Sequence, residues 1–449
     1  MKDTTPSTAI QVQRLLSQLK FAAKAWREWN RDKSLPADRW LARIFAENRK
    51  VLGSRDRRFI SGCVHQVFRN QSYYDYWIQK VAQSDIRDPV KQAKFLCLLG
   101  AVEDGAIDAA VFAAAWNDIK DQAVLERPDE LFQNIREHKI AETEGDVSRA
   151  GWLSLLYSFP VWLVERWTKT LGDTECEALL KATHQRPPLV IRTNTLKISR
   201  EELLAQFTPE EGARAVSDSQ VAICFESNPQ VKNLAAFTDG LFEIQSRASQ
   251  RVVEFIAPKP GEKVWDVCAG GGGKTLFMAA LMQNQGQIYA TDLRSLAIKE
   301  LKLRAERAGA ENIKAADIQR FYKKEVLERF DKIVVDAPCS GTGTLGRAPD
   351  LKWRLEEKSF ADYAKTQLEI LEMALPYLKE GGKIYYITCS VDAAENEEVA
   401  EKFLTRHTDL EQDDLGGIAP KGLRIWPHRE NTDGFFMACF KWKEKKEKP

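Results

Sequence analysis

The sequence predicts a multi-domain chain with an all-α amino-terminal bundle, a small α+β module and a carboxyl-terminal α/β domain of the Rossmann-like type. Three observations support this prediction. Apolar residues recur at helical spacing through the first third, a short middle segment mixes helices with strands, and from about Gly240 short apolar strands alternate with amphipathic helices. Because 449 residues can bury two or three cores, we expect domains at 1–145, 146–238 and 239–449.

The first domain shows helical periodicity throughout. Ile60, Val64, Val67 and Phe68 follow Ser54, which reads as a helix cap. Five tryptophans in this part are better interpreted as packing residues than as platforms for stacked bases: Trp26, Trp29, Trp40, Trp77 and Trp116.

The middle segment begins after a polar stretch, 142–149, that is typical of a linker. Helices are predicted at about 158–172 and 173–184. The run PPLVIRTNTLKISREELLAQF then predicts a strand, a turn, and a helix opened by a capping box of Ser199 and Glu202. A second strand at 221–225 completes a small module.

The last domain reads as a parallel, doubly wound sheet. Strands are predicted at 263–267, 287–291, 312–315, 332–335, 383–387 and 434–440. Helices are predicted near 274–284, 294–308, 359–378 and 391–406.

Composition is typical of a reducing compartment. The eight cysteines form no C-x-x-C pair, and with five histidines they give no cluster at metal-ligand spacing. The amino terminus lacks the layout of a signal peptide, and no apolar run of about 18 residues occurs. We therefore expect a cytoplasmic monomer with free thiols, no metal ion and no membrane segment.

The formal net charge of +1 hides an uneven distribution. Residues 1–60 carry 14 basic and 6 acidic side chains, whereas residues 61–150 carry 10 and 15. A second basic window, 181–200, contains no acid and holds Lys181, Arg186, Arg192, Lys197 and Arg200. Basic residues grouped in this way can bind the phosphates of a nucleic acid. Either group could equally be the solvent-exposed face of a helix.

A glycine-rich loop, VWDVCAGGGGKT, joins the first strand of the last domain to its first helix. Its glycines let a ligand approach the backbone at a helix amino terminus. The P-loop pattern fails because Cys268 stands where a glycine is required, and the dinucleotide pattern lacks its last glycine. The remaining pattern, Asp266 through Gly272, is the looser acidic loop of enzymes that use S-adenosylmethionine (SAM).

Acids follow the next strands. Asp292 ends the second strand, where a carboxylate can accept both hydroxyls of a ribose. Asp317 follows the third strand and could reach an adenine amino group, and Asp336 follows the fourth and could face the reacting centre. Each acid alone could equally be a helix cap, but with Asp266 four of them end successive strands.

Two cysteines follow strands in the same way. Cys339 lies in DAPCSGTG with Arg347, Lys352 and Arg354 after it, and Cys389 lies in ITCS before the helix expected to begin near residue 391. A helix amino terminus or nearby cations can lower a thiol pKa and create a nucleophile. Four other cysteines are better interpreted as buried small hydrophobes: Cys63, Cys97, Cys176 and Cys224.

Methylation of carbon 5 of a pyrimidine requires such a thiol. That carbon becomes nucleophilic only when a group has added to carbon 6, and the thiol leaves once a base removes the proton from carbon 5. Asp336 could hold the ring nitrogen and exocyclic amine of a cytosine, and a second thiol could assist release.

Five segments, DVCAGGGGKT, YATDLRSLAIKELKLRAERAGAENI, DKIVVDAPCSGTGTLGRAPDLKWR, YYITCSVDAAENEEV and DGFFMACF, resemble the successive motifs of the Sun/Fmu family of RNA cytosine-5 methyltransferases. SRDRRFISGCVHQVFRN is more loosely similar to the NusB-like RNA-binding domain of the members that act on ribosomal RNA. The resemblance implies a SAM-dependent enzyme that methylates RNA, with ribosomal RNA as the expected partner.

The family pattern also implies roles for individual residues. Cys389 would be the nucleophile, Cys339 would assist release, and Asp336 would lie near the base. The SAM site would consist of Cys268, Ala269, Gly270, Gly271, Gly272, Gly273, Lys274, Asp292, Asp317 and Asp336. The family loop reads CAAPGGKT, so Gly270 and Gly271 depart from it and make the loop more costly to order.

Other functions remain open at this stage. A DNA cytosine methyltransferase would use Cys339 as its nucleophile, and a transfer-RNA cytosine-5 methyltransferase would share both motifs. A non-catalytic RNA-binding assembly factor on the same fold would tolerate damage to the site, yet both cysteines and all four acids are present.

Overall fold

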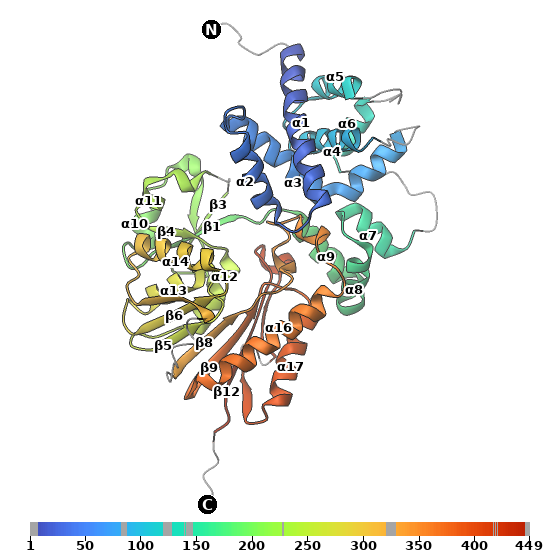
Figure 1. Ribbon diagram of the computed structural model, residues 1–449. Coiled ribbons are helices and arrows are strands. Elements are labelled where there is room, and N and C mark those ends of the chain that lie inside the picture. Colours follow the sequence, from blue (N-terminus) through green and yellow to red (C-terminus); the bar gives the residue numbers. More distant parts are fainter. Residues whose placement is uncertain are drawn as a thin grey trace, which may run out of the picture. The chain divides into compact units, whose positions relative to one another are not determined.

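The computed structural model describes residues 8–81, 88–119, 128–138, 140, 147–226, 229–319, 329–415, 417, 419 and 421–444. The chain divides into two compact units (Figure 1). The helical unit comprises Met1–His184 and Arg347–Leu355, and the sheet unit comprises Gln185–Gly346 and Glu356–Pro449. None of the helices in the described ranges has the length and apolar character that crossing a bilayer requires.

The first six helices share one apolar core, as the sequence predicts. In α1 the buried residues recur every three or four positions, as Leu15, Leu19 and Trp26 illustrate. Trp29 and Trp116 are buried in the same core, which confirms the interpretation of these tryptophans as packing residues. The helices are α1 (Thr8–Arg31), α2 (Ala37–Glu47), α3 (Ser54–Val81), α4 (Pro89–Glu103), α5 (Ala109–Ile119) and α6 (Pro128–Arg136).

Three further helices complete the helical unit: α7 (Arg149–Tyr157), α8 (Val161–Leu171) and α9 (Asp173–His184). The last two confirm the helices predicted in this region. Helix α7 begins directly at the end of the predicted linker, where Ser148 Oγ accepts a hydrogen bond from Gly151 N. Residues 142–146 of that linker lie outside the described residues.

A short segment from the carboxyl-terminal half of the sequence, Arg347–Leu355, belongs to the helical unit. It meets α3 where that helix loses helical geometry, at Asn70 (φ −123°, ψ 16°). Trp353 Nε1 donates to Phe68 O (2.7 Å) and Lys352 Nζ donates to Arg69 O (2.9 Å). The segment therefore supplies donors to carbonyls beside the break in the helix.

The small module is an antiparallel sheet in the order β2-β3-β1-β4. The predicted capping box is present, because Ser199 Oγ accepts from Glu202 N while the Glu202 carboxylate accepts from Ser199 N. The elements are β1 (Leu189–Thr193), α10 (Arg200–Leu204), β2 (Ala213–Ala215), β3 (Ala222–Phe225), α11 (Ala235–Thr238) and β4 (Phe242–Ile244).

The second basic window is only partly available to a nucleic acid. Arg192 lies in β1 with 1% of its surface exposed, and its Nε donates to Gln245 Oε1 at 2.8 Å. It therefore packs the module instead of meeting phosphates, contrary to the expectation for this window. Lys181, Arg186 and Lys197 are exposed.

The large sheet has the order β10-β12-β9-β8-β5-β6-β7, with β11 paired to β12. The five strands from β9 to β7 are parallel, and each overlaps a predicted strand to within a residue or covers it. Its strands are β5 (Lys263–Asp266), β6 (Gln287–Asp292), β7 (Ile313–Asp317), β8 (Phe330–Asp336), β9 (Leu378–Thr388), β10 (Leu410–Asp413), β11 (Leu423–Ile425) and β12 (Phe435–Trp442).

The prediction of a wholly parallel sheet is wrong at one edge. Strand β12, predicted at 434–440, runs antiparallel to β9, and β10 and β11 pair with β12 in antiparallel fashion. These two strands are short and carry polar residues (LEQD and LRI), so their sequence gave no strand signal.

Helices cover both faces of the large sheet (Figure 1). Side chains from α12 (Arg247–Ile256), α13 (Gly273–Leu281) and α14 (Ser295–Ala308) share an apolar cluster with one set of strand residues. Alternate strand residues point to a second cluster with α16 (Ser359–Ala374) and α17 (Glu397–Arg406). A sheet buried on both faces explains why its strands read as continuous apolar runs.

We expect Trp353→Phe to destabilise the helical unit by about 1–2 kcal/mol, because Phe68 O would lose its donor. Trp40→Phe is the matched control. Trp40 packs against the same core beneath Arg43, but its buried Nε1 has no partner among the described residues. Urea unfolding followed by circular dichroism would measure the difference, and equal losses for the two variants would contradict the role given to this bond.

Candidate active site

The predicted site residues gather at the carboxyl edge of the parallel strands. Strand β5 is central, with β6 on one side and β8 on the other, and ligands of open α/β sheets bind in the crevice at such a reversal of strand order. Asp292 lies opposite Asp317 across the β6–β7 pair, and Asp336 lies opposite Ile387 across the β8–β9 pair. The candidate residues of the sheet unit end these strands, or lie in the loops that follow them and at the start of α13.

The loop after β5 has a conformation that needs glycine. Gly270 and Gly272 have φ values of +56° and +85°, which side chains rarely adopt. A Cβ atom at Gly272 would also lie 2.7 Å from Leu301 Cγ. The loop is held to the sheet by a bond from Ala269 N to Thr291 O (2.8 Å). The family loop has an alanine at the position of Gly270. An alanine would be strained at this positive φ, so a glycine suits the backbone conformation found here.

Asp292 is bonded to the same loop. It accepts from Gly270 N at 2.9 Å and from Arg294 through the backbone N and the guanidinium. Burial alone would raise the pKa of Asp292, but the bonds from Arg294 hold it below its ordinary value. A role for Arg294 was not predicted from the sequence, although a basic residue two positions after a strand-ending acid could have indicated this ion pair.

Asp317 lies beside Asp292 at the end of the neighbouring strand. Its Oδ1 accepts from Gln319 N at 2.9 Å, so it also closes a turn, as the alternative interpretation of these acids proposes. Asp292 and Asp317 thus end neighbouring strands, and Asp292 is bonded to the glycine-bearing loop.

Asp336 forms an ion pair with Lys274, the last residue of the predicted cofactor loop. Lys274 Nζ lies 2.6 Å from Asp336 Oδ2 and 5.0 Å from the centre of the Phe435 ring. Burial lowers the pKa of Lys274, but Asp336 more than compensates and keeps it above its ordinary value. A charged pair therefore lies next to the cysteine loops.

Asp266 differs from the other three acids because it is buried beneath the loop. Thr275 Oγ1 donates to its Oδ2 at 2.6 Å, whereas Oδ1 has no partner among the described residues. Burial raises the pKa of Asp266 to about 7. Cys268 is also affected by its surroundings, since burial and the neighbouring acids raise its pKa above the ordinary value.

The structure brings the two candidate cysteines together. Cys339 Sγ and Cys389 Sγ are 3.4 Å apart, and both side chains are partly exposed. The bond to Cys389 and burial together raise the pKa of the Cys339 thiol well above its ordinary value. Either sulfur can be the donor in this contact.

Two expectations about these thiols are wrong. The helix predicted to begin near residue 391 begins at Glu397, because a 3-10 turn (Ala393–Glu395) comes first. No α-helix therefore begins directly after Cys389. Lys352 and Arg354 belong to the helical unit, where their side chains donate to backbone carbonyls.

Close backbone contacts hold the cysteine loops. Gly343 N donates to Cys389 O and Gly434 N donates to Gly343 O, both at 2.8 Å. A Cβ atom at Gly343 would lie 2.2 Å from Gly434 O, so glycine is required there. Four cysteines interpreted as packing residues are buried elsewhere, as predicted: Cys63, Cys97, Cys176 and Cys224.

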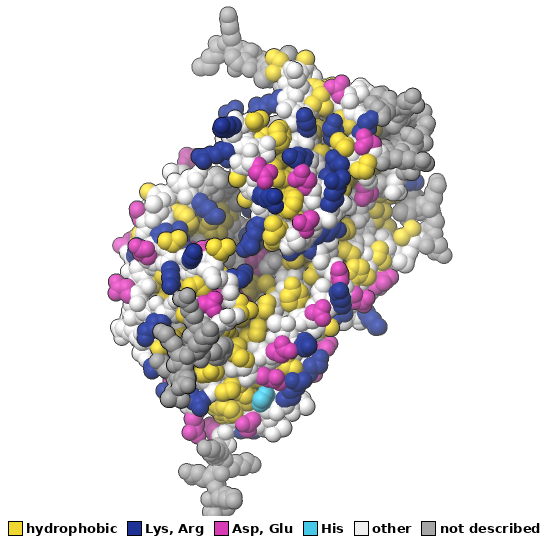
Figure 2. Space-filling view, viewed as in Figure 1, with side chains coloured by type: hydrophobic (Ala, Val, Ile, Leu, Met, Phe, Trp, Pro, Cys, Tyr) yellow, Lys and Arg dark blue, Asp and Glu magenta, His cyan; other side chains and the backbone are white. Residues whose placement is uncertain are grey.

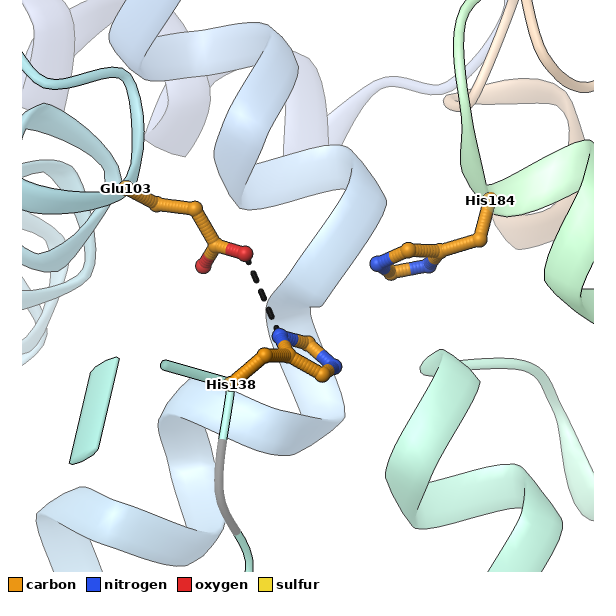
Figure 3. Close-up of side chains that lie close together, drawn as sticks. All are labelled: Glu103, His138 and His184. Carbon is orange, nitrogen blue, oxygen red and sulfur yellow. Dashed lines mark hydrogen bonds and ion pairs between the residues drawn. The ribbon is translucent and has the colours of Figure 1, made fainter. Parts of the chain in front are cut away.

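A second cluster of titratable groups lies within the helical unit, where Glu103, His138 and His184 point toward one another (Figure 3). The His138 ring contacts two acceptors, Glu103 Oε1 (3.1 Å) and Leu156 O (2.8 Å). Burial lowers the pKa of His138, but Glu103 raises it further, to above its ordinary value. Both ring nitrogens of His138 therefore face an oxygen acceptor.

The comparisons with known proteins agree with this geometry. Residues 253–441 match the family described as 16S rRNA methyltransferase RsmB/F, and residues 159–232 match the ferredoxin-like domain of RsmF/B-like methyltransferases. The probable ribosomal RNA small subunit methyltransferase B of Synechocystis sp. is 33% identical over 412 residues, which cover 87% of this chain and 92% of the relative.

Two solved structures are similar as well. The structure of PH0851 has 27% identity and a TM-score of 0.72, and the match covers 95% of this chain and 98% of that one. NSun6 from Pyrococcus horikoshii, solved with SFG, shares the fold with a TM-score of 0.58 at 22% identity, over 64% of this chain and 99% of that one.

We expect Gly272→Ala to weaken SAM binding about tenfold or more, because a side chain there forces a left-handed backbone and meets Leu301. Gly261→Ala is the control, since Gly261 also has a positive φ (+91°) but lies before the cofactor loop, and a Cβ atom there would meet nothing within 4 Å. Titration calorimetry with SAM measures both variants. Equal affinities would show that the loop conformation does not matter for the ligand.

Asp266 gives a pH-dependent prediction. Its pKa is about 7 in the folded chain and about 4 in an unfolded one, so between these values the folded state holds more protons and stability falls as pH rises. Asp266→Asn cannot ionise. Its melting temperature relative to that of the native chain should therefore be higher at about pH 8 than at about pH 5, whereas a pH-independent difference would contradict the assigned pKa.

Proposed function

The chain belongs to the RsmB/F family of 16S rRNA methyltransferases, and on this premise we propose that it methylates carbon 5 of a cytosine in ribosomal RNA through a covalent bond to Cys389. The family activity is SAM-dependent methylation of RNA. The choice of carbon 5 and of the nucleophile is our proposal.

One observation carries the proposal: two thiols, Cys339 and Cys389, lie 3.4 Å apart beside Asp336. Methylation of a nitrogen or a hydroxyl oxygen needs no covalent bond between enzyme and base. Carbon 5 of cytosine does, because it gains nucleophilic character only after addition at carbon 6. Methylation at carbon 5 therefore accounts for the presence of two thiols next to the proposed cofactor loop.

The residues would act as follows. The Cys389 thiolate forms a bond with carbon 6, and the electron pair of the 5,6 double bond moves into the ring, where Asp336 holds the exocyclic amine. Bound SAM supplies the methyl group that carbon 5 takes up. Cys339 then assists release: a base takes the proton from carbon 5, the electrons of that carbon–hydrogen bond re-form the 5,6 double bond, and the bond between carbon 6 and sulfur breaks to leave the Cys389 thiolate.

The cofactor would be held by the loop and the strand-ending acids. Cys268 to Lys274 line the approach, Asp292 and Asp317 face the nucleoside part, and Asp336 lies toward the reacting centre. The glycine backbone supports this assignment, because it admits a ligand where a side chain would meet Leu301.

RNA binding would fall to the domains proposed at 1–145 and 146–238, ahead of a catalytic domain at 239–449. The basic window at the amino terminus supports this, since most of its lysines and arginines are exposed and many gather on the face of the helical unit in Figure 2. Exposed members on α2, α3 and the loop between them are Arg39, Arg43, Arg49, Lys50, Arg55 and Arg58. We propose that one chain acts as a monomer without a metal ion.

A DNA cytosine methyltransferase is the second candidate, favoured only by the Pro-Cys sequence at Cys339. Its nucleophile would be Cys339, and Cys389 would have no role. The raised pKa of Cys339 disfavours it as the resting thiolate.

The two assignments differ in their cysteine variants. With SAM and small-subunit ribosomal RNA, Cys389→Ala should form no covalent complex on a denaturing gel, because the bond to carbon 6 is lost. Cys339→Ala should accumulate the complex, because release is slowed. The reverse pattern, with a complex in Cys389→Ala and none in Cys339→Ala, would overturn the assignment, and a DNA substrate serves as the specificity control.

A further inference from the structure

A buried carboxylate, Glu395, lies behind the two cysteine loops in the sheet unit. It ends the 3-10 turn that follows the ITCS segment, and none of its surface is exposed. A buried carboxylate is costly unless donors surround it. Its donors come from both cysteine loops and from α16.

The first donor residue is the neighbour of Cys339. Ser340 N donates to Glu395 Oε1 at 2.8 Å, and Ser340 Oγ donates to Oε2. The residue after Cys339 is thus held by two bonds to one carboxylate. A charge-assisted pair of this kind is stronger than the same bonds to a neutral acceptor.

The second donor residue is the neighbour of Cys389. Ser390 Oγ donates to Glu395 Oε2 at 2.6 Å, so the serines that follow the two cysteines meet on the same oxygen. Asn396 reinforces this loop, because its Nδ2 donates to Ser390 O and its Oδ1 accepts from Thr388 Oγ1.

The third donor residue, Gln367, anchors the carboxylate to the helical layer. Gln367 Nε2 lies 3.1 Å from Glu395 Oε1 and 3.0 Å from Pro338 O, the residue before Cys339. The Tyr386 hydroxyl, in the strand that leads to Cys389, lies within hydrogen-bond distance of both Gln367 Oε1 and Glu395 O. Burial raises the pKa of Glu395, and its donors oppose that rise.

We propose that Glu395 is a positioning residue that sets the spacing of the Cys339 and Cys389 sulfurs by bonding the serine after each of them. The inference rests on the proposed function for its catalytic consequence, but the spacing itself is a property of the chain alone. Glu395 acts on Cys339, the thiol that assists release, through Ser340. It acts on Cys389, the nucleophile, through Ser390.

The two serines separate the effects. Ser390→Ala removes the hydroxyl that bonds Glu395 from the Cys389 side and should slow formation of the covalent complex with RNA. Ser340→Ala removes the hydroxyl that bonds Glu395 from the Cys339 side and should slow release, so the complex accumulates. Glu395→Gln should lower the single-turnover methylation rate by about tenfold to a hundredfold, the range for reacting groups displaced on the order of an ångström. Loss of fold alone would not move complex levels in opposite directions in the two serine variants.

A chemical readout tests the spacing without RNA or SAM. Diamide, an azo oxidant, takes two electrons and two protons from a thiol pair and becomes a hydrazine while the disulfide forms. Peptide mapping would follow the Cys339–Cys389 link, which should form several-fold more slowly in Glu395→Gln and in each serine variant. Glu398→Gln, an exposed neighbour on α17, is the control and should match the native chain.

The outcomes are distinct. Slower linking in Glu395→Gln and the serine variants, with melting temperatures and SAM affinity preserved, supports the inference. Native linking rates in all three overturn it, as does slowing that merely follows a fall in melting temperature. If the native chain forms no complex with RNA while linking still depends on Glu395, the proposed function fails and the positioning role stands.

Discussion

Parallel pairing of β8 with β9 is the constraint on which the site depends. Because the two strands run in the same direction in adjacent positions, their carboxyl ends meet at one edge, with Asp336 opposite Ile387. The chain leaves each strand through a short loop that carries a cysteine. Two residues 50 positions apart in sequence thereby come to lie with their sulfurs 3.4 Å apart.

Pairing alone would leave these loops loose, and two further devices restrain them. Backbone approach between Gly343 and Gly434 leaves no space for a side chain. The buried carboxylate of Glu395 gathers donors from the serines after both cysteines. The cofactor loop on β5 is restrained in the same manner, by positive φ angles and a bond to Asp292. The reactive side chains thus lie on loops that neighbouring residues hold in place.

Sequence reasoning could predict what periodicity and strand ends determine. The parallel strands, the acids at their ends and both cysteines followed from apolar runs and their terminators. It could not predict contacts between distant segments: that Arg347–Leu355 completes the helical unit, or that Arg192 is buried. Strands β10 and β11 were too short and polar to stand out. Glu395 was hidden because an acid near a helix start usually reads as a cap.

The central claim is that the thiol pair serves methylation at carbon 5. The most direct measurement is mass spectrometry of nucleosides from small-subunit ribosomal RNA after reaction with the purified chain and isotope-labelled SAM. The account predicts label in 5-methylcytidine. Label in a nucleoside methylated at nitrogen or at a ribose oxygen, with both cysteines intact, would contradict it.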